Sequence, residues 1–258
     1  FLHRKVVGAN RHNLLINRAN LTPVSDEAKN HWIGIGRFFR ALEYSNLCAY
    51  FGDVPWFDKE LFPTDQQDLY KPRDPLATVL KNVLADFEFA AANVRISDGT
   101  GQINRYVVLG FMSRKMLYFG TYLKYHNGDQ ELARTLLQKA AWAADQVISS
   151  GKYAVSDNYR ALFTSEDLST NKEVILYREY ETAKVTHAIL SYNNTEGQTG
   201  MTKNAYDSYL AADGFPIKQS PLYNYSGDNG RRNFRNTYAN RDPRLYGTVV
   251  DSLRLNKV

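Results

Sequence analysis

Residues 104–150 read NRYVVLGFMSRKMLYFGTYLKYHNGDQELARTLLQKAAWAADQVISS and divide into two helix-length runs at residues 127–129. The first run is apolar around most of its circumference, which favours a helix packed between layers. The second run places small and apolar residues such as Ala140 and Val147 on one face. Gly128 ends the first helix and Asp129 caps the second, so the sequence predicts an antiparallel helical hairpin.

A second pair of helical runs precedes this hairpin. Residues 28–51 place Trp32, Ile35 and Phe39 on one stripe, and Gly52 ends the run because glycine accepts a positive φ. Residues 74–91 begin at Asp74-Pro75, where aspartate can cap free N–H groups and proline fits the first turn. Their apolar residues follow the spacing of a buried helical face. With the hairpin they make four runs of helical periodicity, and the first of these begins at about residue 28.

The two pairs predict a mainly α fold. They resemble tetratricopeptide packing in layout, but they do not align as a strict repeat, so we expect an irregular α-superhelical bundle with tetratricopeptide-like helical hairpins. We interpret residues 1–258 as one domain with a helical core at about 28–151. Residues 152–258 predict a loop-rich, ligand-facing segment with short strands. Within it, residues 173–177 are the best strand candidate, and residues 202–211 predict a short helix.

Composition excludes several classes of protein. The 258 residues include 32 basic and 27 acidic side chains, for a formal net charge of +5, and the basic residues are spread along the chain. The densest basic spot, Arg231, Arg232 and Arg235, is too short for a nucleic-acid surface. The longest apolar stretch lies around residues 106–112, far shorter than a membrane span. The single cysteine, Cys48, allows no intrachain disulfide and predicts a buried small side chain.

The sequence carries no strong catalytic or metal signal. The five histidines form no His-x-x-x-His pair, and no nucleophile elbow, phosphate loop or dinucleotide fingerprint occurs. Asp53 and Asp58 offer two carboxylates for a glycosidase pair, but Asp53 belongs to a predicted turn, which favours a structural role. We therefore predict no catalytic residue, no metal ligand and no cofactor, and leave open a structural cation in a loop.

Ligand binding is predicted in the loops, where aromatic rings lie beside amides. Sugars present C–H faces and a rim of hydroxyls, so aromatic side chains next to Asn, Asp, Gln or Arg are the expected partners. By contrast, Arg73, Arg241 and Arg244 flank Asp-Pro steps and are predicted to be structural ion-pair partners. The candidate ligand contacts are Trp56, Phe57, Tyr192, Asn193, Asn194, Tyr223, Asn224 and Tyr225. For Trp56 and Phe57, packing of the turn against the core is an equal alternative.

Six short strings, in this order, resemble the SusD/RagB family of outer-membrane nutrient-binding lipoproteins. Any one string is weak, and the combination carries the resemblance, which spans nearly the whole chain. The family's signal peptide with its lipid-acceptor cysteine, its first helix and its C-terminal segment are expected to lie outside these residues. The strings are RFFRALEYSNLCAYFGDVP (37–55), RDP (73–75), GQINRY (101–106), NKEVI (171–175), YLAADGFPI (209–217) and NRDPRL (240–245).

The resemblance implies a cell-surface, lipid-anchored binding protein at the outer membrane that catalyses no reaction. It implies capture of oligosaccharides, or of peptides in RagB-like members, and transfer to a SusC-like TonB-dependent transporter. No nucleic acid is expected as a partner, and the membrane only through an anchor that this chain does not contain. Two other classes stay open: a helical-repeat scaffold that binds a protein partner, and a glycoside hydrolase.

Overall fold

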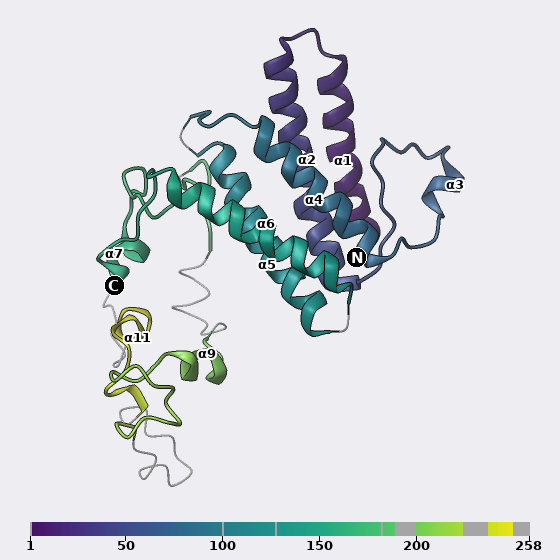
Figure 1. The fold of residues 1–258 in the computed structure, drawn as a ribbon. Coiled ribbons are helices and arrows are strands. Elements are labelled where there is room, and N and C mark those ends of the chain that lie inside the picture. Colours follow the sequence, from purple (N-terminus) through teal and green to yellow (C-terminus); the bar gives the residue numbers. More distant parts are fainter. Residues whose placement is uncertain are drawn as a thin grey trace. The chain divides into compact units, whose positions relative to one another are not determined.

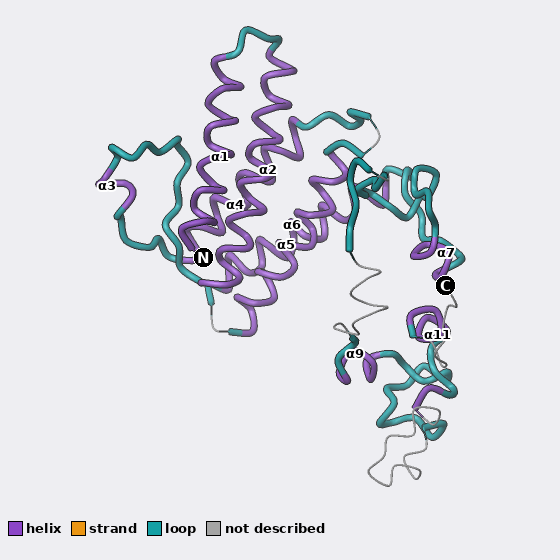
Figure 2. The backbone as a smooth tube through the Cα atoms, turned by 180° about the vertical axis from the view of Figure 1, so that it is seen from behind, coloured by secondary structure: helices purple, strands orange, loops and turns teal. Residues whose placement is uncertain are grey.

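The computed structural model describes residues 2–99, 101–126, 128–181, 183–188, 200–223 and 237–249. The chain forms two compact units, which we name by their residues. Unit 1 comprises Phe1–Val155 and Lys172–Arg178, and unit 2 comprises Ser156–Asn171 and Glu179–Val258. In the described residues the backbone is helix or loop, with three isolated β-bridges and no strand (Figure 2). The predicted mainly α class is confirmed.

Unit 1 is built from long helices that lie side by side (Figure 1). Helix α1 packs on α2, α2 on α4, α4 on α5, and α5 on α6. Across the described residues, no helix combines the length and apolarity needed to cross a bilayer. The helices are α1 (Leu2–Leu21), α2 (Asp26–Phe51), α3 (Gln66–Leu69), α4 (Leu76–Asn93), α5 (Arg105–Tyr125) and α6 (Gln130–Ser149).

Local sequence explains where these helices begin and end. The side chains of Ser25, Asn104 and Asp129 accept hydrogen bonds from the first free N–H groups of α2, α5 and α6. Gly52 ends α2 at φ 66°, a conformation that costs glycine little. Asp74 does not cap α4 as predicted: the N–H of Leu76 donates to Asp53 instead, at 2.7 Å. Asp129, at the start of α6, is the cap that the sequence predicted for the second helix of the hairpin.

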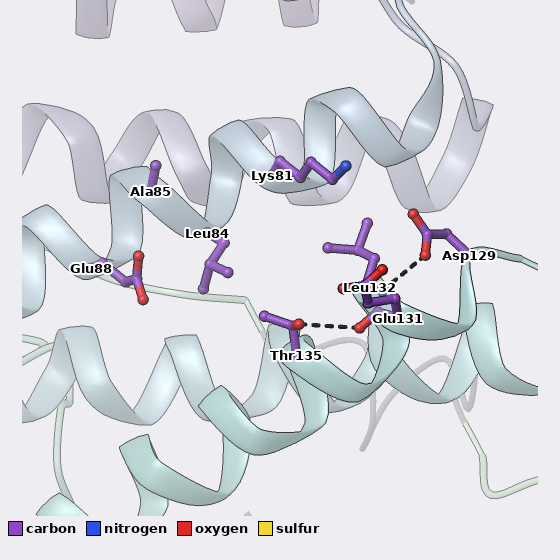
Figure 3. Close-up of a pocket in the computed structure, with 8 residues that line it drawn as sticks. All are labelled: Lys81, Leu84, Ala85, Glu88, Asp129, Glu131, Leu132 and Thr135. Atoms are coloured by element: carbon purple, nitrogen blue, oxygen red, sulfur yellow. Dashed lines mark hydrogen bonds between the residues drawn. The ribbon is translucent and has the colours of Figure 1, made fainter.

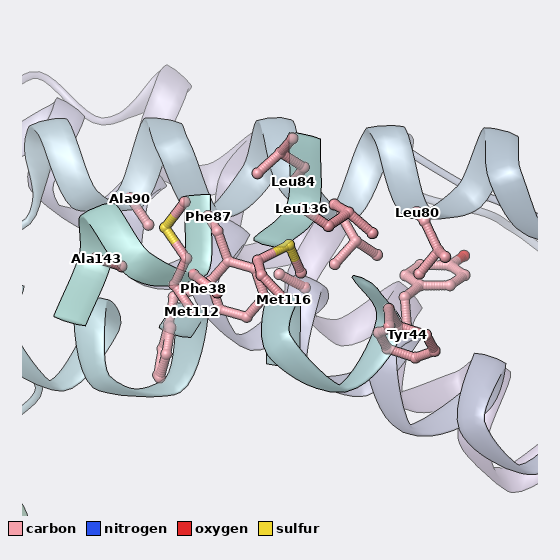
Figure 4. Close-up of a cluster of buried hydrophobic side chains, with 14 of the residues drawn as sticks. Phe38, Tyr44, Leu80, Leu84, Phe87, Ala90, Met112, Met116, Leu136 and Ala143 are labelled. Carbon is pink, nitrogen blue, oxygen red and sulfur yellow. The ribbon is translucent and has the colours of Figure 1, made fainter. Parts of the chain in front are cut away.

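The core of unit 1 lies where α2, α4, α5 and α6 meet, and Figure 4 shows its large side chains pointing toward one another. Phe38 contacts Phe87 and Phe111 through edge-on rings, at 6.3 and 5.7 Å between centroids. The predicted stripe of α2 is partly wrong, because Trp32 and Phe39 are 47% and 36% exposed and Phe38 is buried instead. Cys48 is buried as predicted, and burial raises the pKa of its thiol to about 12.

Helix α1 was not predicted, and its packing explains why. It meets the rest of unit 1 through polar as well as apolar side chains. The buried Asn13 donates to the carbonyls of Phe57 and Lys59, at 3.0 and 2.7 Å. Helix α1 is also on average the least hydrophobic of the long helices, so it carries little of the apolar signal by which a sequence reveals a helix. The expectation that the first helix of these residues begins near residue 28 is therefore wrong.

The predicted strand at residues 173–177 is also wrong. The described residues provide no strand with which this segment could pair. Its apolar side chains are used differently: Ile175 packs against the core of unit 1, and its Cδ1 would lie 3.7 Å from a Cβ at Gly110. A β-branched apolar segment can thus cover a helix without forming a ladder.

Unit 2 consists of short helices joined by long loops. Its helices are α7 (Tyr159–Thr164), α9 (Lys203–Ser208) and α11 (Pro243–Thr248). The predicted helix at residues 202–211 is confirmed but shorter, and Thr202 caps it. A β-bridge joins Ala211 to Arg241, and Ala211, Ile217 and Leu245 are buried around it. The interpretation of residues 1–258 as one domain stays a prediction.

Candidate functional site

Three hollows in the described residues differ in the side chains that line them. The first, of about 310 Å³, lies between α4 and α6 in unit 1 (Figure 3). Charged and aliphatic side chains line it, including Lys81 and Glu88, and no aromatic ring does. The carboxylate of Asp129 accepts the N–H of Leu132 at 2.9 Å, so it already caps α6. This hollow offers no face for a flat ligand.

The second hollow, of about 430 Å³, lies in unit 1 along α5 and the segment 173–176. Its lining is mostly aliphatic, with Phe111 as the one ring and Arg114 and Glu173 as the charged groups. Few polar groups converge on it, whereas a specific small-molecule site needs placed polar partners.

The third hollow, of about 260 Å³, lies in unit 2 and combines rings with polar groups. Its lining comes from α7, from the end of α9 with the two residues after it, and from α11. Residues far apart in the sequence therefore meet at one place. We call it the tyrosine hollow and define it by its lining residues, which are Tyr159, Ser208, Tyr209, Leu210 and Arg244.

One hydroxyl links both tyrosines of the hollow. The hydroxyl groups of Tyr159 and Tyr209 lie 3.2 and 3.3 Å from Oγ1 of Thr248. Gly247 lets the Tyr159 ring approach α11, because a Cβ there would lie 3.0 Å from its Cδ1. Phe163, which is exposed, lies beside Tyr159 at 5.0 Å between ring centroids. The rings are thus held by contacts outside the hollow.

The charged group of the hollow is held by a neighbouring carboxylate. Asp242 caps α11 by accepting the N–H of Arg244 at 2.9 Å, and the Arg244 guanidinium also donates to this carboxylate through Nε and Nη2. These hydrogen bonds lower the pKa of Asp242 and raise the pKa of Arg244. The predicted ion pair of Arg244 is therefore confirmed.

Two aromatic faces, a hydroxyl and a guanidinium are the groups that a sugar ring contacts through its C–H face and hydroxyl rim. The five described lining residues include no carboxylate that could act as an acid or base. Within the described part of the chain, no group of three His, Cys, Asp or Glu side chains is placed to hold a metal ion.

Two predicted ligand residues lie in unit 1, next to its interior. Phe57 is 5% exposed, and its N–H donates to the hydroxyl of Tyr44 at 2.7 Å. Trp56 is half-buried, with its ring 4.3 Å from that of Tyr44 and 5.2 Å from the guanidinium of Arg40. Both placements favour packing of the turn against the core over ligand contact.

Of the predicted ligand residues in unit 2, the structure describes Tyr223. This half-buried residue lies with its ring 6.0 Å from the Arg241 guanidinium. Tyr192, Asn193, Asn194, Asn224 and Tyr225 lie outside the described residues. Their role as ligand contacts stays a prediction.

The structure gives different outcomes for the predicted roles of Arg241, Arg73 and Asp53. Arg241 has no carboxylate partner among the described residues, so its predicted ion pair is wrong: its guanidinium donates to backbone carbonyls. Arg73 is exposed and forms no ion pair within the described chain. Asp53 caps α4, which is the structural role that the sequence favoured.

The lining residues of the tyrosine hollow were not among the predicted contacts. Tyr209 and Arg244 lie in the strings YLAADGFPI and NRDPRL, so part of the signal was present. What the sequence could not show is that these strings pair: the bridge between Ala211 and Arg241 joins residues 30 positions apart.

No known family model and no curated protein sequence matches the chain. Solved structures do match it. A SusD-like protein from Bacteroides fragilis NCTC 9343 matches with a TM-score of 0.68 and 21% identity, and the match covers 95% of this chain and 48% of the chain of that protein. A SusD-like carbohydrate binding protein from the same strain has a TM-score of 0.67 and 22% identity, over 96% and 46%. A laminarin binding SusD-like protein has a TM-score of 0.52 and 23% identity, over 67% and 35%.

The chain spans about half the length of the first two structures. At these identities the likeness concerns the fold, and it agrees with the family resemblance of the six sequence strings. The chain therefore has the fold of the SusD-like proteins.

Proposed function

We propose that the chain is the glycan-binding part of a SusD-like nutrient-binding protein and that the tyrosine hollow contacts the oligosaccharide. The observation that carries this proposal is the meeting of Tyr159 and Tyr209 with Ser208 and Arg244 in one hollow. Two of the similar structures support it, since they are described as carbohydrate binding and laminarin binding.

We also propose a wider role, which the family resemblance of the sequence suggests. The protein would act without catalysis at the cell surface, as a lipid-anchored component of the outer membrane that passes its ligand to a SusC-like TonB-dependent transporter. The helices of unit 1 would serve as tetratricopeptide-like hairpins that support the binding segments. Tyr223 and the predicted residues outside the described chain are proposed as further contacts.

Calorimetric titration of the purified chain with xyloglucan and laminarin oligosaccharides tests the glycan proposal. Removing one ring from the hollow, by Tyr159→Ala or Tyr209→Ala, should weaken binding about fivefold, since a ring contact contributes about 1 kcal/mol and 1.4 kcal/mol is a factor of ten. Tyr118→Ala is the matched control, because this tyrosine is 48% exposed on α5 of unit 1. Equal affinity of all three variants would refute the assignment of the site.

Two further outcomes address the alternative functions. If peptides are titrated beside the oligosaccharides, exclusive binding of the peptides would replace the glycan proposal by a RagB-like one. New reducing ends after incubation with the polysaccharides would show catalysis and overturn the proposal that the protein only binds.

A further inference from the structure

Arg241 is the most deeply buried charged residue in the described part of unit 2, with 2% of its surface exposed. Every hydrogen-bond acceptor of its guanidinium among the described residues is a backbone carbonyl. Nε donates to Leu210 at 3.4 Å, and Nη1 donates to Thr237 at 2.8 Å. Nη2 donates to both Tyr206 and Tyr209, at 2.8 and 2.7 Å. One side chain therefore joins four carbonyls of two segments.

Three of these carbonyls belong to the segment that forms one wall of the tyrosine hollow. Helix α9 ends at Ser208, and the last carbonyls of a helix lack partners within the helix. Arg241 supplies donors to Tyr206 in the last turn and to Tyr209 and Leu210 directly after it. The backbone of two lining residues is thus fixed from behind the hollow.

The backbone around Arg241 ties this wall to the next one. The N–H of Asp242 donates to the carbonyl of Leu210 at 2.9 Å, and the N–H of Ala212 donates to that of Asn240 at 2.8 Å. The N–H of Arg241 itself donates to the hydroxyl of Tyr246 in α11, at 2.9 Å. Arg244, the charged lining residue, follows two positions after Asp242.

We infer that Arg241 is the positioning residue of the tyrosine hollow: without touching the ligand, it sets the backbone of Tyr209 and Leu210 against the start of α11. This inference rests on the proposed function. The shape of arginine matters, since five N–H donors in a planar fork reach several carbonyls at once, whereas a lysine ammonium is a single point. The rings of Tyr206 and Tyr223 lie 5.2 and 6.0 Å from the guanidinium and favour a flat group.

The test compares Arg241→Lys with a control of matched chemistry in unit 1. Arg40→Lys also removes a buried guanidinium fork, one that binds Asp86. Both variants are titrated with xyloglucan and laminarin oligosaccharides at a temperature where circular dichroism shows them folded. We expect Arg241→Lys to weaken binding at least about tenfold and Arg40→Lys to leave it unchanged, although both lower the melting temperature. An equal loss in both variants would reduce Arg241 to a general stabilising role and overturn the inference.

Tyr246→Phe is a milder second variant, because it removes only the hydroxyl that accepts the Arg241 N–H. It should weaken binding less than Arg241→Lys does. Unchanged affinity in Arg241→Lys and Tyr246→Phe, while Tyr209→Ala loses affinity, would refute the positioning role and leave the proposed function intact.

Amide hydrogen exchange separates failure of the inference from failure of the proposed function. Arg241→Lys should accelerate exchange in residues 206–212 and leave α5 and α6 unchanged, whether or not a sugar binds. Faster exchange without any glycan binding by the wild type would uphold the positioning of this wall and refute the glycan site. Unchanged exchange would refute the inference itself.

Discussion

Among the described residues, each unit contains one buried arginine, and the two are bound in different ways. In unit 1, Arg40 forms a two-pronged pair with Asp86, at 2.7 and 2.8 Å, between α2 and α4. In unit 2, Arg241 binds four backbone carbonyls. Helices satisfy their own carbonyls, so a charge between helices needs a carboxylate. Loops leave carbonyls free, so there a guanidinium can take the place of regular secondary structure.

The difference teaches where each unit tolerates change. In unit 1 the buried helices pack on one another, and the buried Arg40 pairs with a side-chain carboxylate. Unit 2 has a small apolar core, and its backbone is held by side-chain donors. A binding site formed by such loops can differ among proteins of one fold without a change in the helical support.

The largest expected effect is the loss of the carboxylate in unit 1. Asp86→Ala leaves the Arg40 charge buried without its partner, which should cost about 3–5 kcal/mol in the free energy of unfolding. Urea unfolding followed by circular dichroism measures it. The double variant Arg40→Met, Asp86→Leu removes both charges and should recover most of this loss. A double variant as unstable as Asp86→Ala would contradict the explanation by an unpaired charge.

A smaller effect is expected where α5 meets α6. A Cβ at Gly120 would lie 2.7 Å from Cγ of Leu137 and 3.2 Å from the carbonyl oxygen of Ala133, so Gly120→Ala should destabilise the protein by about 1–3 kcal/mol. Gly110→Ala on the same helix is the control. Its nearest neighbour would be Ile175 at 3.7 Å, and the alanine should add up to about 1 kcal/mol of stability through helix propensity. Changes in melting temperature of the same sign in both variants would show that packing does not explain the difference between these two positions.

In unit 2, substitution of Gly247 should lower the affinity for the oligosaccharide. Gly247→Ala brings a methyl group to 3.0 Å from the Tyr159 ring, so that the ring must shift by a few tenths of an ångström. We expect oligosaccharide affinity to fall by less than about tenfold, that is by less than about 1.4 kcal/mol. Gly200→Ala, with nothing within 4 Å, should bind as the wild type does. Equal affinities for both variants would argue against ligand contact by Tyr159.

The smallest effect concerns the exposed ion pair of α11. Hydrogen bonds from Arg244 lower the pKa of Asp242 below its ordinary value of 3.8. An acid with a depressed folded pKa contributes stability above its unfolded pKa, and this contribution is lost as the pH falls from about 3.8 through the folded value. Asp242→Asn keeps an N-cap oxygen but removes this dependence. The tyrosine fluorescence of both proteins, titrated from pH 5 to pH 2, should differ below about pH 4; identical curves would contradict it.

The sequence revealed α2, α4, α5 and α6, and it missed α1, which is on average the least hydrophobic of the long helices. The hairpin of α5 and α6 follows from its stripe and from its cap Asp129. Helix α1 has a buried amide in place of a pure apolar face, and the segment 173–177 has the composition of a strand without a partner. For the site, the sequence indicated aromatic loops in unit 2 but selected other tyrosines, because exposure and pairing are not local properties.

By itself, then, the sequence determined the helical class, most helix ends in unit 1 and the SusD-like order of short strings, since periodicity and capping act within a few residues. Only the tertiary structure decided that Tyr159, Tyr209 and Arg244 share one hollow and that Arg241 holds its backbone. Those relations depend on hydrogen bonds between segments 30 or more residues apart, and a local sequence pattern does not reveal such bonds.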